Sequence, residues 1–228
     1  MARRRLGVRS DQQMRRCDVS DQLSMFDPID RSDTTGARVI ELDGGDVTYD
    51  PACFATDEAD RLFQAVTATT PWRQEMIWMY GREVPVPRLT AWVGDPGKTY
   101  TYSNIALQPE PWTEPLLEIK DRVEHAAATA FNSVLLNLYR TGADSVAWHS
   151  DDEPELGRAP VIASVSLGAT RRFQLRQRSN AAERCELNLQ HGSLLLMRGH
   201  TQHVWEHQVP KTAKPTGPRV NLTFRTII

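Results

Sequence analysis

The feature that most constrains the fold is a succession of short strands, separated by turns, in the C-terminal half of the chain. Residues 133–139 alternate, so that Asn137 and Tyr139 take one face while Leu136 and Leu138 take the other. Further strand-like runs cover residues 161–167, 172–176, 185–189, 193–197 and 218–227, and residues 168–170 indicate a hairpin turn between two of them. So many short strands predict a sandwich or jelly roll with helices packed outside it.

The polar faces of these strands predict a bound ligand. The last strand-like run places Arg219, Asn221 and Arg225 on one face and apolar side chains on the other. Asn137 and Tyr139 add two more polar groups of the same kind. Buried charges and amides are costly unless they find partners, so this inward polar face is not an ordinary core. We expect a polar ligand to complete it.

Three residues form a candidate metal site. His149 and Asp151 are two residues apart, so on a strand or at a strand end they point to the same side, and His207 follows far downstream. Two histidines and one carboxylate on one side of an ion are the facial triad of non-haem Fe(II) oxygenases, which leaves several positions open. An isolated His-x-Asp pattern is more often a surface histidine beside an acidic loop.

The arginines favour the oxygenase interpretation. Oxygenases of this type fill the open iron positions with O2 and with the keto acid end of 2-oxoglutarate, whose far carboxylate needs a buried cation. Arginine suits that role because its planar guanidinium binds a carboxylate through two parallel hydrogen bonds. Arg219 and Arg225 are six residues apart, and therefore on one strand face, shortly after His207.

The N-terminal half predicts helices and an aromatic segment. Thr56 is expected to cap a helix that runs to about residue 68, and Thr113 one that runs to about residue 127. Between them, residues 71–102 mix tryptophans and tyrosines with arginines. This mixture suits stacking on nucleic-acid bases, and it is equally typical of an aromatic sheet edge.

Composition supports neither a membrane protein nor non-specific binding to nucleic acid. The formal net charge is −2 and the pI is about 6.3, whereas proteins attracted to phosphate are usually basic. No apolar run is long enough to span a bilayer. We expect a soluble, intracellular monomer, cytoplasmic or nuclear. Residues 1–35 are rich in arginine and predict a disordered basic tail, either a leader without a role or an arm that holds nucleic acid.

Four stretches of the sequence resemble the AlkB family of Fe(II)/2-oxoglutarate-dependent nucleic-acid dealkylases, in particular its homologue 3 type. They are FNSVLLNLYR (131–140), WHSDDEP (148–154), IASVSLGATR (162–171) and PRVNLTFR (218–225). The likeness covers about residues 70–228. It implies a mixed, mainly β fold, a double-stranded β-helix (jelly roll) with flanking N-terminal helices. Residues 36–228 would form one dioxygenase domain, with helices and a nucleotide-recognition lid in 36–130 and the jelly-roll core in 131–228.

The resemblance also implies a role for each site residue. The iron ligands would be His149, Asp151 and His207. The contacts to 2-oxoglutarate would be Asn137, Tyr139, Arg219, Asn221 and Arg225. The substrate-binding residues would be Trp72, Tyr100 and Tyr102 beside a flipped base, Asp152 and Glu153 near its exocyclic nitrogen, and Arg88 on the substrate strand.

By the same resemblance, Fe(II), O2 and 2-oxoglutarate would serve to oxidise N-methyl groups of the 1-methyladenine or 3-methylcytosine type, releasing formaldehyde. The partner would be alkylated DNA or RNA that is single-stranded or has the target base flipped out. Four arginines form either a phosphate-binding stripe or a solvated hairpin: Arg171, Arg172, Arg176 and Arg178. Two other functions stay open, a 2-oxoglutarate oxygenase for a protein, lipid or small molecule, and a non-catalytic roll that binds nucleic acid.

Overall fold

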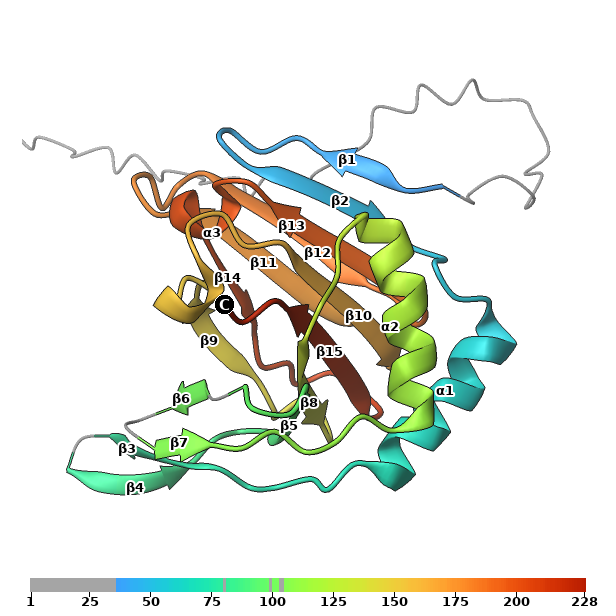
Figure 1. Cartoon of the computed structure of the whole chain (residues 1–228). Helices are drawn as coiled ribbons and strands as arrows, with labels where there is room; N and C mark the ends of the chain where they lie inside the picture. Colours follow the sequence, from blue (N-terminus) through green and yellow to red (C-terminus); the bar gives the residue numbers. More distant parts are fainter. Residues whose placement is uncertain (1–35, 80, 99, 103–104) are drawn as a thin grey trace, which may run out of the picture.

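A computed structural model describes residues 36–79, 81–98, 100–102 and 105–228, and the basic tail predicted at residues 1–35 lies outside them (Figure 1). Two antiparallel sheets face each other. The larger has the order β1 (Arg38–Ile40), β2 (Asp46–Asp50), β13 (Ser193–Arg198), β10 (Ile162–Gly168), β15 (Arg219–Arg225), β8 (Ser133–Tyr139), β5 (Leu89–Gly94). The smaller has the order β12 (Arg184–Leu189), β11 (Arg171–Gln177), β14 (Trp205–Val209), β9 (Val146–His149).

The chain path confirms the predicted jelly roll. From β8 to β15 the chain passes repeatedly from one sheet to the other, and only β11 and β12 follow each other within the same sheet. The predicted hairpin at residues 168–170 is therefore wrong, because β10 and β11 belong to different sheets. Gly168 instead turns the corner, with φ of +86° and no room for a Cβ atom, which would lie 2.5 Å from the carbonyl oxygen of Pro218.

The expected division into a lid region before residue 131 and a jelly-roll core after it does not follow the sheets. Strands β1, β2 and β5 come from the N-terminal part of the chain, yet they extend the larger sheet at both of its edges. The strands that belong to neither sheet form two small two-stranded ribbons, β3 (Met76–Met79) with β4 (Arg82–Pro85), and β6 (Tyr100–Tyr102) with β7 (Ile105–Leu107).

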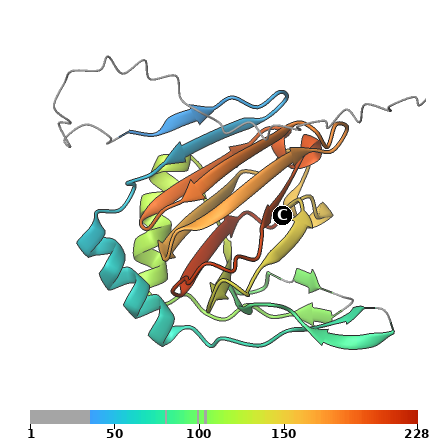
Figure 2. The same cartoon turned by 180° about the vertical axis from the view of Figure 1, so that it is seen from behind.

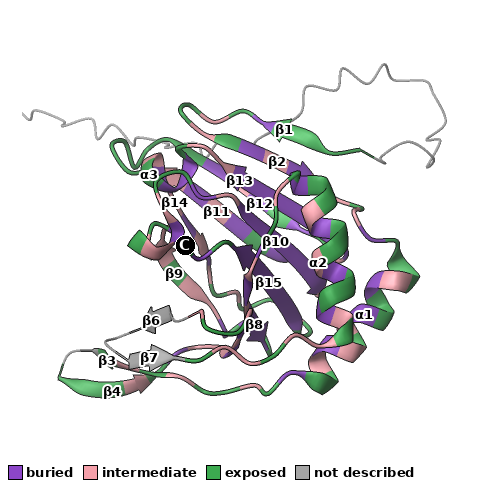
Figure 3. Cartoon of the chain, viewed as in Figure 1, coloured by how far each residue is buried: buried purple, intermediate pink, exposed green. Residues whose placement is uncertain are grey.

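Two apolar cores hold the layers together. Helices α1 (Thr56–Thr69) and α2 (Glu114–Ala127) pack on the outer face of the larger sheet, where Leu62 and Ile119 are fully buried (Figure 2). A second core fills the space between the sheets and contains Leu175 and Trp205. Burial of this kind contributes roughly 1.5–3 kcal/mol per large apolar side chain. The strands are accordingly buried along most of their length, whereas the β3–β4 ribbon is mostly exposed (Figure 3).

The helix starts differ in part from expectation. Thr113 occupies the N-cap position of α2, but its side chain makes no capping hydrogen bond, and only its carbonyl oxygen accepts hydrogen bonds from Leu116 and Leu117. Thr56, however, is the first residue of α1, and the N-cap is Ala55, which has no side chain that could cap. Two short helical segments complete the fold, η1 (Pro154–Leu156) and α3 (Thr201–Val204). Across the described ranges, no helix combines the length and apolarity that crossing a membrane requires.

Candidate active site

The residues predicted to bind the metal and the co-substrate meet in a cavity of about 730 Å³ between the two sheets. Strand pairing brings them there. On the smaller sheet His207 of β14 lies directly opposite His149 of β9. On the larger sheet β15 and β8 pair so that Arg219 lies opposite Tyr139, and Asn221 opposite Asn137. The faces that the sequence predicted to be polar therefore line one shared space.

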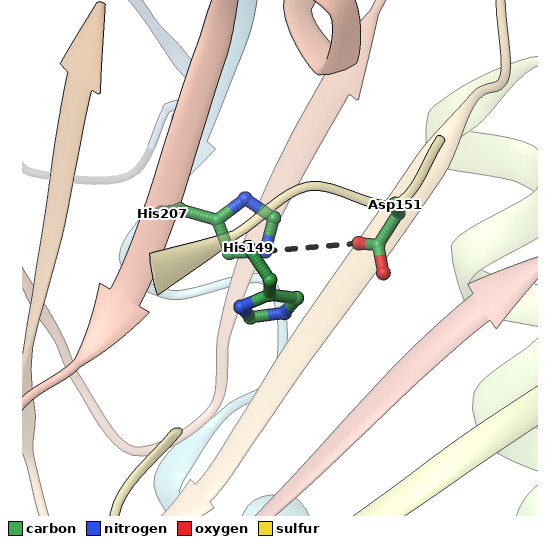
Figure 4. A group of neighbouring side chains, drawn as sticks. All are labelled: His149, Asp151 and His207. Carbon is green, nitrogen blue, oxygen red and sulfur yellow. Dashed lines mark ion pairs between the residues drawn. The ribbon is translucent and has the colours of Figure 1, made fainter. Parts of the chain in front are cut away.

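His149, Asp151 and His207 form a group that could hold a metal ion. Their ligand atoms all lie within 4.8 Å of one another. His207 Nε2 is 3.7 Å from a carboxylate oxygen of Asp151, and the two imidazole rings lie edge to face with centroids 4.3 Å apart (Figure 4). Two imidazole nitrogens and a carboxylate gathered on one side of a cavity are the donor set of the facial triad.

Neighbouring groups orient two of the three candidate ligands. The Nδ1 atom of His149 lies 2.8 Å from the carbonyl oxygen of Ala147, so it carries the proton and leaves Nε2 with a free lone pair. The backbone N–H of Asp151 donates to the side-chain oxygen of Gln202 at 2.9 Å. The guanidinium of Arg225 donates to the Asp151 carboxylate from the other side. The backbone of Asp151 is thus held by Gln202 and its carboxylate by Arg225.

The environment also sets the protonation states. Burial acts to raise the pKa of Asp151, but the positive charge of Arg225 and the two nearby histidines outweighs it, so the pKa lies below its usual range. Burial and the adjacent His149 lower the pKa of His207 to about 3. At neutral pH the group therefore presents an anionic carboxylate and a neutral imidazole, the forms in which both side chains bind metals.

The deep part of the cavity fits a dianionic co-substrate. Arg219 is 0% exposed, and only one of its nitrogens, Nη2, has a hydrogen-bond partner among the described residues, the hydroxyl of Ser166 at 2.8 Å. Its Nε and Nη1 atoms are buried without one. Burial lowers the pKa of Arg219 to about 10, which leaves it charged at neutral pH. A buried cation with unused donors is costly unless an anion completes it, and a carboxylate matches its planar fork.

The remaining predicted co-substrate contacts surround this arginine. The guanidinium of Arg219 lies over the ring of Tyr139, 5.2 Å from its centroid. Asn221 donates to the hydroxyl of Ser164 at 2.8 Å, and Asn137 accepts from the side chain of Arg88 at 2.5 Å. Arg88, expected on the substrate strand, therefore also touches a residue expected at the co-substrate.

The structure brings only some of the predicted substrate residues to the cavity. Glu153 and Arg88 line it. Asp152 does not, because its carboxylate forms an ion pair with Arg178 at 2.6 Å. Trp72 packs against the outer core instead, and its indole donates to the carbonyl oxygen of Thr67. Tyr100 and Tyr102 lie in β6, but their side chains are outside the described part of the molecule.

The four arginines do not form one stripe. Arg171 points inward and donates to the carbonyl oxygens of Thr141, Asp144 and Pro210. The other three are paired with acids, with the closest N–O distances between 2.6 and 3.7 Å: Arg172 with Glu186, Arg176 with Glu206, and Arg178 with Asp152. This pairing favours the solvated hairpin.

Several cavity residues were missed by the reasoning from sequence, among them an aromatic residue and two charged ones. Trp148 precedes His149, and Arg176 lies over its ring at 4.3 Å. Because Trp148 directly precedes the His-x-Asp motif, the sequence did contain a signal that it lies near the site. Glu75 and Lys211 also line the cavity, from the segments before β3 and after β14. Nothing in their local sequence indicates this position, which results from the tertiary fold.

Comparisons with known proteins agree with this geometry. Residues 46–225 match the family model of the 2OG-Fe(II) oxygenase superfamily. Over 179 residues the chain is 46% identical to alpha-ketoglutarate-dependent dioxygenase alkB homolog 3 of Bos taurus, an overlap of 75% of this chain and 62% of that protein. Over 201 residues it is 38% identical to DNA oxidative demethylase ALKBH2 of Homo sapiens, an overlap of 84% and 77%.

The chain thus spans slightly less than two thirds of the alkB homolog 3 relative. Among solved structures, that of OsALKBH1 superimposes with a TM-score of 0.63 at 15% identity and covers 84% of this chain and 100% of that one, which shows the fold alone. The sequence likeness to alkB homolog 3, the match to ALKBH2 over most of its length and the donor set of the cavity lead to one assignment. The chain belongs to the 2OG-Fe(II) oxygenase superfamily and, within it, to the AlkB family, whose members use Fe(II) and 2-oxoglutarate.

Proposed function

We propose that residues 36–228 act as one dioxygenase domain that removes methyl groups from N-alkylated bases of the 1-methyladenine and 3-methylcytosine type. The substrate would be DNA or RNA, and formaldehyde would be released. One observation carries the proposal: the cavity that holds the His149, Asp151 and His207 group also contains the buried, incompletely satisfied guanidinium of Arg219. A metal-binding triad beside a site for a dianion is what a 2-oxoglutarate oxygenase needs.

In this proposal the inner residues bind and orient the two cofactors. His149, Asp151 and His207 would hold Fe(II), and Arg225 would keep the Asp151 carboxylate ionised and fixed. When bound, iron supplies the activation of O2 that couples decarboxylation of 2-oxoglutarate to succinate with oxidation of the N-methyl carbon. The contacts to 2-oxoglutarate would come from Arg219, Asn137, Tyr139, Asn221 and Arg225.

The outer part of the cavity would receive the base. A volume of about 730 Å³ is within the range of ligand sites and accommodates 2-oxoglutarate together with one base. A base inside a duplex cannot reach the metal, so it would enter from a single strand or after flipping. Glu153, Trp148 and Arg88 line the cavity, and we expect Tyr100 and Tyr102 to stack on the base from the lid. We propose no base contact for Asp152 or Trp72, since other contacts occupy them.

We further propose that the protein acts as a monomer on intracellular nucleic acid. The large apolar side chains exposed on the described surface lie on separate elements, namely β1, β3, α2 and the C-terminal residue. Scattered apolar residues of this kind are normal for a monomer. Light scattering across a range of concentrations tests this point.

The main experiment measures succinate and formaldehyde released by the purified protein with Fe(II), ascorbate and 2-oxoglutarate. The substrate is a short single-stranded oligonucleotide with one 3-methylcytosine, beside its unmethylated twin, and a duplex form of each gives the strand preference. Equal amounts of both products with the methylated strand only would support the proposal. Succinate without methyl-dependent formaldehyde would point to another substrate class. If neither product formed, the non-catalytic binding module would be the remaining interpretation.

A further inference from the structure

The lid side of the cavity holds a carboxylate that no role described so far uses. Glu75 is half-buried, lines the same cavity as the metal-binding group, and lies in the segment that leads into the β3–β4 ribbon. Within the described ranges its side chain makes no hydrogen bond and no ion pair. A partly desolvated carboxylate without a partner is unfavourable unless a ligand completes it.

The backbone fixes Glu75 firmly in this position. Its carbonyl oxygen accepts a hydrogen bond from the N–H of Val86 at 2.8 Å. Two residues earlier, Arg73 and Thr90 exchange a pair of backbone hydrogen bonds, each 2.9 Å long. These hydrogen bonds tie the start of the ribbon to β5 and to the residues just before it. Glu75 is therefore held against the cavity, although the tip of the ribbon is exposed.

Two arginines in this region of the chain are engaged elsewhere. Arg73 forms an ion pair with Glu110 at 2.5 Å. Arg140, which contacts the neighbouring Gln74, forms its ion pair with Asp144 at 2.8 Å. In the described structure the charge of Glu75 thus remains available to whatever enters the cavity.

Most charged groups at the inner end of the cavity already have a role in binding the dianion or the metal. Arg219 and Arg225 supply positive charge where the dianion would bind, and the charge of Asp151 is used by the metal-binding group and by Arg225. A base methylated at the positions proposed above carries a positive charge, so it would be attracted by a carboxylate on the lid. We infer that Glu75 is a specificity-determining residue that favours cationic N-methylated bases over neutral ones. This inference rests on the proposed function.

The test compares two lesions that differ in charge and are methylated at the same ring position, 3-methylcytosine (cationic) and 3-methylthymine (neutral). Glu75→Gln keeps the size of the side chain and removes its charge. Glu83→Gln is the matched control, because Glu83 is an exposed acid on β4 of the same ribbon and does not line the cavity. Two readouts are taken: kcat/KM for each oligonucleotide, and the Kd of each for the Fe(II)/2-oxoglutarate-loaded protein without O2, where no turnover occurs.

We expect Glu75→Gln to lower the preference for 3-methylcytosine over 3-methylthymine about tenfold, through the loss of one charge-assisted contact. The ratio of the two kcat/KM values should fall about tenfold, and the ratio of the two Kd values should rise about tenfold. The kcat/KM and Kd for 3-methylthymine should stay within about twofold of those of the unsubstituted protein. Glu83→Gln should change neither ratio. An unchanged ratio in Glu75→Gln, or equal losses for both lesions, would overturn the role of Glu75 while leaving the demethylase activity intact. Failure of the unsubstituted protein to distinguish methylated from unmethylated strands would instead overturn the proposed function, and this inference with it.

Discussion

The inner and outer ends of the cavity are built in different ways. At the inner end, His207, Asp151 and Arg219 are nearly inaccessible, and strand register positions two of them. At the outer end, the β3–β4 ribbon stands apart from both sheets, and Trp78 on it is 72% exposed. The inner end is therefore defined by the fold itself. The outer end is defined by side chains that can change while the sheets stay intact.

This difference has an energetic reason. A one-residue slip of β15 against β8 would turn the polar side chains of β15 toward the apolar core on the other face of the sheet, so the register is strongly specified. No comparable penalty protects the ribbon, which contributes few buried groups. We expect substitutions of buried residues at the inner end to affect stability and cofactor binding together, and substitutions at the outer end to affect substrate binding alone.

The largest effect is expected from removal of the carboxylate ligand. Asp151→Ala should reduce demethylation below about one per cent, since loss of a ligand exceeds the 10–100-fold cost of losing its hydrogen-bond partners. It also breaks the buried ion pair between Asp151 and Arg225, which should cost about 3–5 kcal/mol of unfolding free energy. Formaldehyde release measures the demethylation, thermal melting measures the stability, and Co(II) absorption measures metal binding.

His149→Ala separates these effects. His149 is only half-buried and forms no ion pair in the described structure, so its loss should abolish metal binding at little cost in stability. Full activity in either variant would exclude the metal assignment.

Substitution of Arg219 should show that this residue serves 2-oxoglutarate binding at a cost in the stability of the ligand-free protein. Replacing Arg219 by Met removes a fully buried charge with two unpartnered nitrogens, so the ligand-free protein should become more stable by about 1 kcal/mol. The same change should weaken 2-oxoglutarate binding by at least about 3 kcal/mol, roughly 100-fold. Denaturant unfolding and calorimetry with Mn(II) in place of iron measure the two quantities.

Arg198→Met is the matched control for this pair of effects. Arg198 is half-buried on β13, contacts the hydroxyl of Thr48 and does not line the cavity. It should leave 2-oxoglutarate affinity unchanged. If Arg219→Met retained wild-type affinity, the dianion would have to bind elsewhere.

The inner end was largely predictable from the sequence because one simple rule governs it. Alternation along strands identified the polar faces, and it paired His149 with Asp151. The same rule separates neighbouring residues in two further places. Glu153 continues the series and lines the cavity, whereas Asp152 lies out of phase and pairs with Arg178. Arg171 likewise shares the inward face of its strand with the buried Phe173.

Other features depend on contacts between distant parts of the chain. The hydrogen bond from Arg88 to Asn137 joins residues 49 positions apart, and the ion pair of Arg225 with Asp151 spans 74 positions. No local pattern indicates such pairs. A glycine at a sheet corner and a glycine in a hairpin also look alike in sequence, which is why the turn at Gly168 was misassigned.

Trp78 offers a direct test of the outer end. Because its side chain is mostly exposed, Trp78→Ala should change the unfolding free energy by less than about 0.5 kcal/mol. Stacking on a base contributes about 1–3 kcal/mol, so affinity for a single-stranded oligonucleotide should fall about fivefold or more. Val39→Ala, at an exposed apolar residue on β1, should leave affinity unchanged in the same anisotropy assay. Identical behaviour of the two variants would mean that the ribbon does not contact the strand.

The smallest effect is expected at Lys211, which lines the cavity and forms no ion pair with the residues that the structure describes. If its ammonium meets a backbone phosphate, Lys211→Met should weaken methylated and unmethylated strands alike, by about two- to threefold, and reduce the salt dependence of binding by about one phosphate contact. Lys214→Met, three residues later in the same loop and away from the cavity, is the control. A loss confined to methylated strands would place Lys211 at the base instead, and the division between a cationic inner end and an anionic lid would need revision.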